Sequence, residues 1–215
     1  MSLRTLREEL EEEKFRVSIF GSARIKMGDP RYKQVNALGK MLGEKGIDLV
    51  TGGGAGLMVA ANSGHKLGSK KSGAHSIGLN IKLPNEQKAN KHLDVKKEFS
   101  IFSDRLDEFM LLSNVVVVAP GGVGTLLELM YSWQLVQVEH VCNMPIILMG
   151  DMWKGFLEWL RENPLKLKMF DEKDYYLLFW AKTPREAMEV INEAYEAYKM
   201  GDKNFCLNYK KYKIK

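Results

Sequence analysis

Short, mostly apolar segments alternate along the chain with longer segments of helical periodicity. The run VVVV at 115–118 is typical of a strand buried on both faces, because no polar side chain interrupts it. The pattern predicts seven strands, at about 17–20, 47–50, 74–79, 95–99, 115–118, 145–149 and 176–180. It predicts helices at about 29–45, 56–68, 103–112, 122–138, 152–161 and 183–199.

Residues that favour helix ends support these limits. Asp29 and Thr183 are good N-caps, and each is followed by a proline, which suits the first helical turn. Glu186 stands three residues after Thr183, as in a capping box. Gly46 is placed to end the first helix.

The alternation of strands and helices predicts the fold class. Apolar strands joined by helices indicate a mostly parallel sheet of about seven strands with helices on both faces. Because no internal repeat or linker divides the chain, we expect a single doubly wound, Rossmann-like α/β domain. We place it at residues 15–200, with a charged N-terminal arm at 1–14 and a basic C-terminal tail at 201–215.

The charge of the chain is unevenly distributed. The 215 residues carry a formal net charge of +5, with 32 Lys and Arg against 27 Asp and Glu. Residues 202–215 hold five Lys and one Asp, which leaves only +1 for the rest. The sequence pI of about 9.0 therefore reflects the tail, and nucleic acid is disfavoured as a partner.

Other compositional features indicate a cytoplasmic protein. Two cysteines are too few for a disulfide framework, which favours a reducing compartment. The chain has no apolar run long enough to span a membrane, and its N-terminus is charged throughout, unlike a secretion signal.

Three glycine-rich segments follow predicted strands, at 21–22, 52–56 and 121–125. In doubly wound folds, ligands bind where such loops meet helix N-termini at the carboxyl ends of the strands. Glycine lets backbone N–H groups approach an anion, and the helix dipole favours negative charge there. Glycine also serves tight turns for purely steric reasons, so one such loop is weak evidence. Two glycine-rich loops that converge at one edge of the sheet predict a phosphate-bearing ligand.

Two common nucleotide motifs are absent from these loops. Neither Gly52 nor Gly54 begins a GxGxxG fingerprint, because Leu57 and Val59 occupy the sixth positions. No loop continues into Gly-Lys-Ser/Thr, as a P-loop would. NAD chemistry and phosphoryl transfer from ATP are therefore disfavoured.

The segment PGGVGTLLE at 120–128 adds reactive groups to a glycine loop. Thr125 and Glu128 are three residues apart and share one face of the predicted helix. A carboxylate pointed toward an anion loop is electrostatically unfavourable unless it serves chemistry. The alternative is a capping box between the two residues.

This segment resembles the PGGxGTxxE signature of the LOG (Lonely Guy) family, which is similar to cytokinin riboside 5'-monophosphate phosphoribohydrolases. Members are often labelled "possible lysine decarboxylase". FGSARI at 20–25, VTGGGAGLM at 50–58 and GLNIKLPNEQ at 78–87 resemble further family segments in the same order. The resemblance extends over about residues 15–195.

The resemblance implies hydrolysis of the N-glycosidic bond of AMP or a related, even cytokinin-type, nucleotide to free base and ribose 5-phosphate. It implies a catalytic pair, Arg105 and Glu128. A carboxylate can stabilise the positive charge that develops on the ribose ring, and a guanidinium can orient that carboxylate. The expected phosphate- and nucleotide-binding residues are Gly21, Ser22, Gly53, Gly54, Glu86, Gly121, Gly122, Gly124 and Thr125.

The chain departs from the family pattern at two positions, which leaves the choice of base open. Leu106 follows Arg105 where the family usually has Lys, and Leu127 replaces a usual Glu. Without the resemblance, Arg105 would be read as half of a surface ion pair with an acidic residue one turn away. Family members are homodimers or larger, which makes Trp133 and residues 136–138 candidate subunit contacts.

Other functions fit the sequence less well. The segment SGHK at 63–66 imitates a pyridoxal-phosphate decarboxylase motif, but Lys66 lies near a predicted helix end, where a cation complements the dipole. We therefore disfavour lysine decarboxylation, and we expect neither a metal nor a cofactor. The alternative to a hydrolase is a non-catalytic nucleotide or molybdenum-cofactor carrier on the same fold.

Overall fold

Seven parallel strands form one sheet in the computed structural model, which describes residues 13–82 and 89–201. The strand order is β4-β3-β2-β1-β5-β6-β7. This confirms the predicted fold class, and the sheet is parallel throughout. The strands are β1 (Arg16–Phe20), β2 (Asp48–Thr51), β3 (Ser76–Ile81), β4 (Val95–Phe99), β5 (Val115–Val118), β6 (Ile146–Met149) and β7 (Leu178–Ala181).

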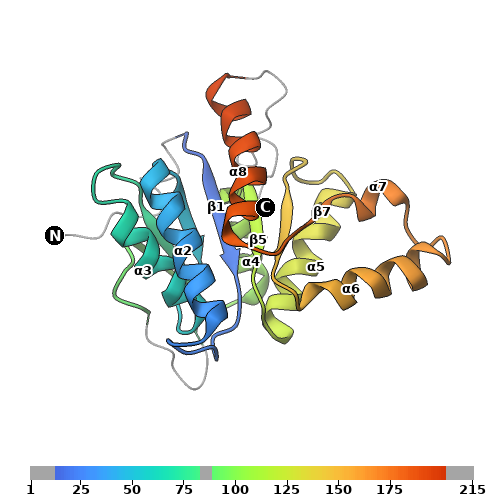
Figure 1. Ribbon diagram of the computed structural model, residues 1–215, viewed down its shortest axis with the longest axis horizontal. Helices are drawn as coiled ribbons and strands as arrows, with labels where there is room; N and C mark the ends of the chain where they lie inside the picture. The colour runs from blue at the N-terminus through green and yellow to red at the C-terminus, as the bar shows by residue number, and fades with distance from the viewer. Residues whose placement is uncertain (1–12, 83–88, 202–215) are drawn as a thin grey trace.

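Helices cover both faces of the sheet (Figure 1). One face carries α2 (Pro30–Lys45), α3 (Leu57–Gly68) and α8 (Pro184–Lys199), and the other carries α4 (Phe102–Leu112), α5 (Val123–Gln137) and α6 (Trp153–Leu160). The sequence of strand β5 is entirely apolar because helices cover both of its faces. Val115 and Val117 pack under the first group of helices, whereas Val116 and Val118 pack under the second.

The predicted helix ends are confirmed. The Asp29 carboxylate accepts a hydrogen bond from the Arg31 backbone N–H, and Gly46 adopts the left-handed conformation with φ of 78°. The Thr183 hydroxyl accepts from the backbone N–H of Glu186, whose carboxylate accepts from Lys182 N–H at 2.8 Å. These caps act over a few residues, which is why the sequence alone locates them.

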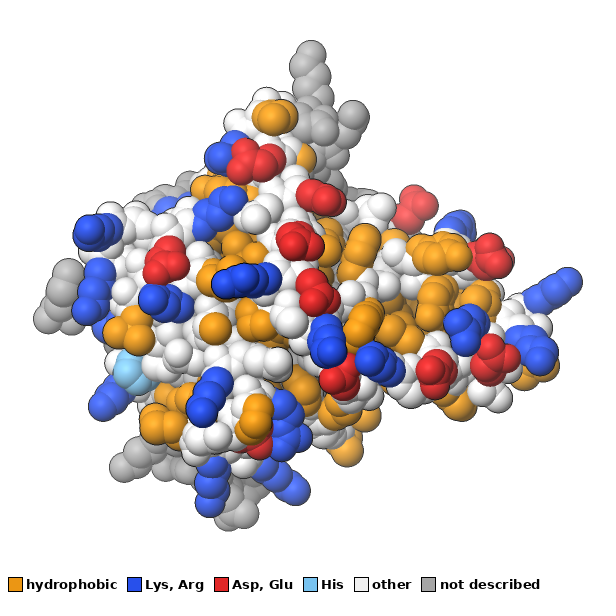
Figure 2. Space-filling model, viewed as in Figure 1, with side chains coloured by type: hydrophobic (Ala, Val, Ile, Leu, Met, Phe, Trp, Pro, Cys, Tyr) orange, Lys and Arg blue, Asp and Glu red, His pale blue; other side chains and the backbone are white. Residues whose placement is uncertain are grey.

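A helical extension beyond α6 was not predicted. A π-helix (Arg161–Leu165) continues α6, and a short helix α7 (Glu172–Tyr175) precedes β7. The Trp133 indole N–H donates to the Asp174 carbonyl at 2.8 Å and so ties α7 to α5. Figure 2 shows exposed hydrophobic side chains among charged ones over this end of the molecule.

Two expectations from the sequence meet the structure in this part of the chain. Of the candidate subunit contacts, Val136 is buried in the core, Trp133 is half-buried and packs edge-to-face on Phe170, and Val138 is 55% exposed. Val136 therefore serves the chain's own packing, and Trp133 and Val138 remain candidate contacts. Cys142 is disulfide-bonded, whereas the cysteine count favoured reduced thiols. Cys206 and most of both predicted terminal segments lie outside the described residues. No helix in the described ranges has the length and apolarity needed to cross a membrane.

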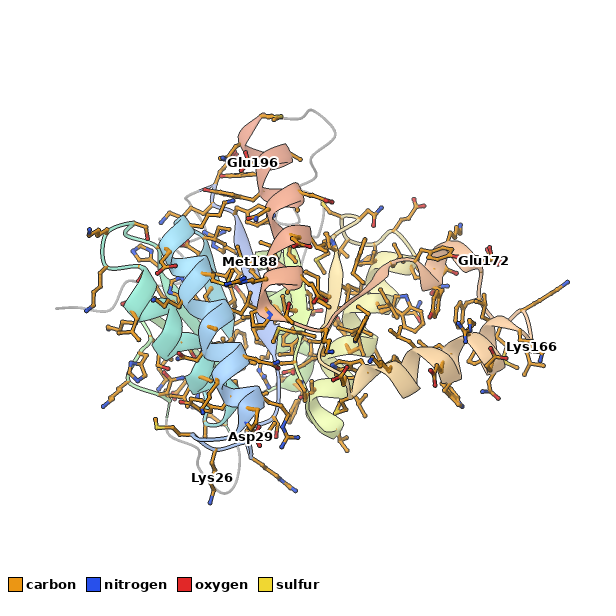
Figure 3. The ribbon with its side chains drawn as sticks, in the orientation of Figure 1. Lys26, Asp29, Lys166, Glu172, Met188 and Glu196 are labelled. Atoms are coloured by element: carbon orange, nitrogen blue, oxygen red, sulfur yellow. The ribbon has the colours of Figure 1, made fainter. Side chains whose placement is uncertain are left out.

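The strand order reverses between β1 and β5, because successive strands from β1 run to one side and those from β5 run to the other. Loops leaving the carboxyl ends of these two strands diverge to opposite faces and open a crevice. In Figure 3, Lys26 and Asp29 mark this edge of the molecule, where the segment after β1 leads into α2. The three glycine-rich loops meet here.

Candidate active site

The first glycine loop contacts the other two directly. The Ser22 N–H donates to the Pro120 carbonyl at 3.1 Å, and the Ser22 carbonyl accepts from Leu57 N–H at 2.9 Å. This close approach requires glycine at position 56, which has φ of 65° and where a Cβ would lie 2.2 Å from the Ser22 oxygen. The convergence expected from the sequence is therefore present, with the first loop between the N-termini of α3 and α5.

A cavity of about 540 Å³ opens between the loops. Most of the site residues predicted from the sequence line it: Gly21, Ser22, Gly54, Arg105, Gly122, Gly124, Thr125 and Glu128. Gly53 and Gly121 are not among the lining residues. Glu86 lies outside the described residues.

Gly53 and Gly121 shape the loops from behind. The Gly53 N–H donates to the Thr51 hydroxyl at 3.0 Å, and its carbonyl accepts from Asn90 N–H at 2.8 Å, so its backbone polar groups face the protein. At Gly121, a Cβ would lie 2.0 Å from the Thr125 hydroxyl oxygen. Glycine at 121 thus makes room for Thr125 at the cavity wall.

The N-terminus of α5 is open toward the cavity. Gly122 is the N-cap and provides no side-chain hydrogen bond, and the first intrahelical bond runs from Leu126 N–H to the Gly122 carbonyl. The N–H groups of Val123, Gly124 and Thr125 precede that bond, and all three residues line the cavity. Such a helix end suits an anion. The alternative capping box is not formed, because Thr125 lies inside the helix and Glu128 bonds elsewhere.

Arg105 and Glu128 form an ion pair inside the cavity. The Arg105 Nη2 and Glu128 Oε1 atoms are 2.7 Å apart, and both side chains are almost buried, at 11% and 12% exposure. Arg105 Nε also donates to the Leu79 carbonyl at 3.0 Å, and its guanidinium lies over the Phe109 ring. The alternative of a surface pair within α4 is therefore contradicted. α4 and α5 place the two residues opposite each other.

Burial changes the acidity of Glu128. Removing the carboxylate from water raises its pKa from 4.5 to about 7, although the attraction and hydrogen bond of Arg105 oppose the rise. Both protonation states are therefore populated near neutral pH. A carboxyl group with this pKa can hold or activate a water molecule and can exchange a proton.

Sequence reasoning missed two polar residues in the cavity wall, Arg24 and Asn80. Arg24 follows the first glycine loop, and it makes no ion pair with any described residue. A cation close behind a glycine loop is a signal that the sequence did contain. Asn80 at the end of β3 carried no such signal, because its role depends on which atoms surround it.

The decarboxylase-like segment lies apart from the cavity. His65 is buried, and its Nε2 atom contacts the Ile47 carbonyl at 2.9 Å, while Lys66 pairs with Asp94 at 3.8 Å on the surface. Neither residue lines the cavity. Within residues 13–82 and 89–201, no group of three or more His, Cys, Asp or Glu is arranged to hold a metal ion.

Comparisons with known proteins place these features in a family. The model of the family described as "Possible lysine decarboxylase" matches residues 58–191, more than half of the chain. This stretch contains Arg105 and Glu128, all of α4 and α5, and α3 except its first residue. No curated protein matches the chain in sequence.

Solved structures with the same fold include two described as molybdenum-cofactor proteins. The molybdenum cofactor binding protein of Rippkaea orientalis is 22% identical, with a TM-score of 0.61, and the match covers 84% of this chain and 97% of that one. The molybdenum cofactor carrier protein of Chlamydomonas reinhardtii is 20% identical, with a TM-score of 0.61, covering 86% and 99%. At these identities the likeness shows the fold. On the family match, the chain belongs to the LOG-like family described as possible lysine decarboxylases.

Proposed function

We propose that the protein is a nucleoside 5'-monophosphate phosphoribohydrolase. It would hydrolyse the N-glycosidic bond of AMP or a related nucleotide to the free base and ribose 5-phosphate. The observation that carries this proposal is the nearly buried Arg105–Glu128 pair, 2.7 Å apart, beside an open helix N-terminus in one cavity. A protein that only binds a phosphate has no need of such a pair.

The phosphate would lie at the start of α5. The N–H groups of residues 123–125 offer donors without formal charge, and the Ser22 and Thr125 hydroxyls add two more. Because Arg105 is neutralised by Glu128, Arg24 supplies the cation that a phosphate monoester dianion needs. With the phosphate there, the ribose would lie next to Glu128, one helical turn further along α5.

Glu128 would act where positive charge develops. Breaking the bond between C1' and the base nitrogen gives the ribose ring oxocarbenium character, which an adjacent carboxylate stabilises. Water adds its oxygen to C1' as the bond to the base breaks, and Glu128 accepts one proton of that water. The departing base nitrogen takes a proton from solvent, and Glu128 returns its proton to solvent after the step. Arg105 orients the carboxylate and keeps part of the Glu128 population ionised near neutral pH.

The test is incubation with a panel of nucleoside 5'-monophosphates, followed by chromatography of the products. We expect equal amounts of free base and ribose 5-phosphate from the unmodified protein. Glu128→Gln should abolish this release while calorimetry still detects nucleotide binding. Tight binding of a nucleotide by the unmodified protein without any turnover would reject the hydrolase.

That last outcome would favour the second candidate, a non-catalytic carrier of a nucleotide or of the molybdenum cofactor. The observation that supports it is the likeness in fold to two molybdenum-cofactor proteins. The glycine loops and Arg24 would serve a carrier as well as an enzyme. The Arg105–Glu128 pair is what favours hydrolysis.

The proposal includes a homodimer or larger assembly, as the family resemblance implies. An exposed apolar strip on α5 supports self-association. It consists of Val123, Leu126, Leu127 and Met130, whose exposures range from 37% to 85%. Equilibrium sedimentation of the unmodified protein and of Met130→Glu would test whether this strip joins subunits.

A further inference from the structure

The side chain of Asn80 is buried in the cavity wall without a hydrogen-bonding partner. Asn80 is 6% exposed, and within residues 13–82 and 89–201 its Oδ1 atom has no hydrogen-bonding partner. Its amide nitrogen likewise donates to no group in the described parts of the chain. Because most buried polar groups are paired, an unpaired carboxamide in a ligand cavity needs an explanation.

Two neighbouring asparagines show that the protein satisfies this residue type when it serves structure. Asn62 donates to the Ser76 hydroxyl at 2.8 Å and accepts from the Thr51 hydroxyl at 2.9 Å. Asn90 donates to the carbonyls of Gly53 and Gly54 at 3.1 and 3.2 Å. Asn80 lies beside the same loop, since a Cβ on Gly53 would be 2.3 Å from its Oδ1 atom. Its bonding capacity is nevertheless unused.

The strand order places Asn80 at the end of the cavity opposite the phosphate loop. β3 is separated from β5 by β2 and β1, so the two strands lie about 14 Å apart at roughly 4.8 Å per strand spacing. Arg105 bridges this interval, because it bonds both the carbonyl of Leu79 on β3 and the carboxylate of Glu128 on α5. A nucleotide with its phosphate at α5 and its ribose at Glu128 therefore extends its base toward Asn80.

The surroundings of Asn80 suit a planar ring. Met58, Ile81 and Phe102 line the same cavity, and the Phe102 side chain is 49% exposed. These side chains offer apolar area on which a base can stack. The start of α5, in contrast, brings Gly122 and Gly124 to the cavity, and Arg24 follows the first glycine loop, with its backbone N–H bonded to the Ser22 hydroxyl.

We propose that Asn80 recognises the edge of a 6-aminopurine. The inference rests on the proposed function for the orientation of the nucleotide. A carboxamide both donates and accepts, and its terminal torsion is soft enough to turn either atom toward the ligand. Adenine offers a donor at N6 and an acceptor at N7, which an asparagine pairs with two hydrogen bonds. A 6-oxopurine offers two acceptors on this edge and leaves the Asn80 oxygen unpaired.

The proposal predicts discrimination between AMP and IMP. The two nucleotides share their phosphate and ribose, so contacts at α5 and Glu128 are the same for both. A two-bond pairing of this kind discriminates by about 10- to 100-fold. We expect the unmodified protein to prefer AMP in kcat/KM by that factor, and Asn80→Ala to reduce the preference to less than about threefold.

The experiment uses two readouts and a matched control. Dissociation constants for AMP and IMP are measured by calorimetry in a Glu128→Gln background, and kcat/KM is measured with Glu128 in place. Asn114→Ala is the control, because Asn114 is also buried but bonds Arg16 N–H before β5, at the opposite edge of the sheet. Asn80→Leu keeps the volume of the side chain and tests whether a cavity alone explains the result. Thermal unfolding confirms that each variant is folded.

Loss of the AMP preference in both Asn80 variants but not in Asn114→Ala supports the inference. Equal affinity of the parent protein for AMP and IMP, or a preference that survives Asn80→Ala, overturns it. If neither nucleotide releases its base, the hydrolase proposal fails, but the ratio of dissociation constants still decides the role of Asn80. If neither nucleotide binds, both proposals are rejected.

Discussion

Replacing Arg105 with methionine should raise the pKa of Glu128 further above its ordinary value. In the folded protein, burial raises this pKa to about 7, while the Arg105 guanidinium acts in the opposite direction. Methionine fills much of the same space with a flexible apolar side chain and removes the charge. Burial then still raises the pKa of the Glu128 carboxyl group, and no cation remains to lower it.

The size of the effect follows from the contact. The two side chains meet at 2.7 Å and are about nine-tenths buried, so solvent screens them little. An opposite charge this close typically lowers a carboxyl pKa by about 1–3 units. Its removal should therefore shift the Glu128 pKa from about 7 to between about 8 and 10. At pH 7 the ionised fraction would fall from about half to about a tenth or less.

The assay is a carbon-13 NMR titration of protein labelled at the glutamate carboxyl carbon, with the Glu128 signal identified by its absence in Glu128→Gln. This measurement does not depend on any catalytic activity. Arg105→Lys keeps a cation and should shift the pKa less than Arg105→Met. A Glu128 pKa in Arg105→Met that is equal to or below that of the unmodified protein would refute the reasoning.

Three further outcomes are expected. Glu128→Gln should change how stability depends on pH. Because the pKa of Glu128 is higher in the folded protein than in the unfolded chain, its contribution to stability is full below about pH 4.5 and is lost as the pH rises through 7. Between pH 4 and 9, the free energy of unfolding of the unmodified protein should fall by about 3 kcal/mol relative to that of the variant, as measured by urea unfolding. Arg24→Met should weaken calorimetric binding of AMP by about tenfold and leave adenosine binding unchanged, because a charge-assisted hydrogen bond is worth about 1.5 kcal/mol; equal losses for both ligands would contradict a phosphate contact. Gly121→Ala should lower stability by about 1–3 kcal/mol and weaken AMP binding, because its Cβ would lie 2.0 Å from the Thr125 oxygen. Gly122→Ala, with no atom within 4 Å of the added Cβ, should be tolerated and serves as its control in thermal unfolding.

Much of the fold could be predicted because its signals are local. The apolar strand at 115–118 matches β5, and the caps at Asp29 and Thr183 locate their helices. The helical extension after α6 was missed because it depends on packing. Helix α7 has only four residues, and the hydrogen bond from the Trp133 indole to the Asp174 carbonyl holds it to α5. No periodicity can emerge from so short a segment.

The candidate site was predicted only in part. Residues alone left Arg105 and Glu128 open to ordinary structural explanations, and the family resemblance was needed to pair them across 23 positions. Gly53 was expected to face the ligand, but its N–H and carbonyl are bonded to Thr51 and Asn90. Asn80 was not expected at all. A glycine or an asparagine in a loop has the same sequence pattern whether its polar atoms face solvent, protein or ligand.

The sequence by itself determined the succession of strands and helices along the chain, the positions of the glycine loops and the residues available for chemistry. These follow from periodicity, chain stiffness and side-chain type, which act over a few positions. Only the tertiary structure decided which groups share the cavity, how far Glu128 is removed from water and which amide is left unpaired. Burial and charge depend on atoms brought together from β1, β3, α4 and α5, and no local pattern encodes those contacts.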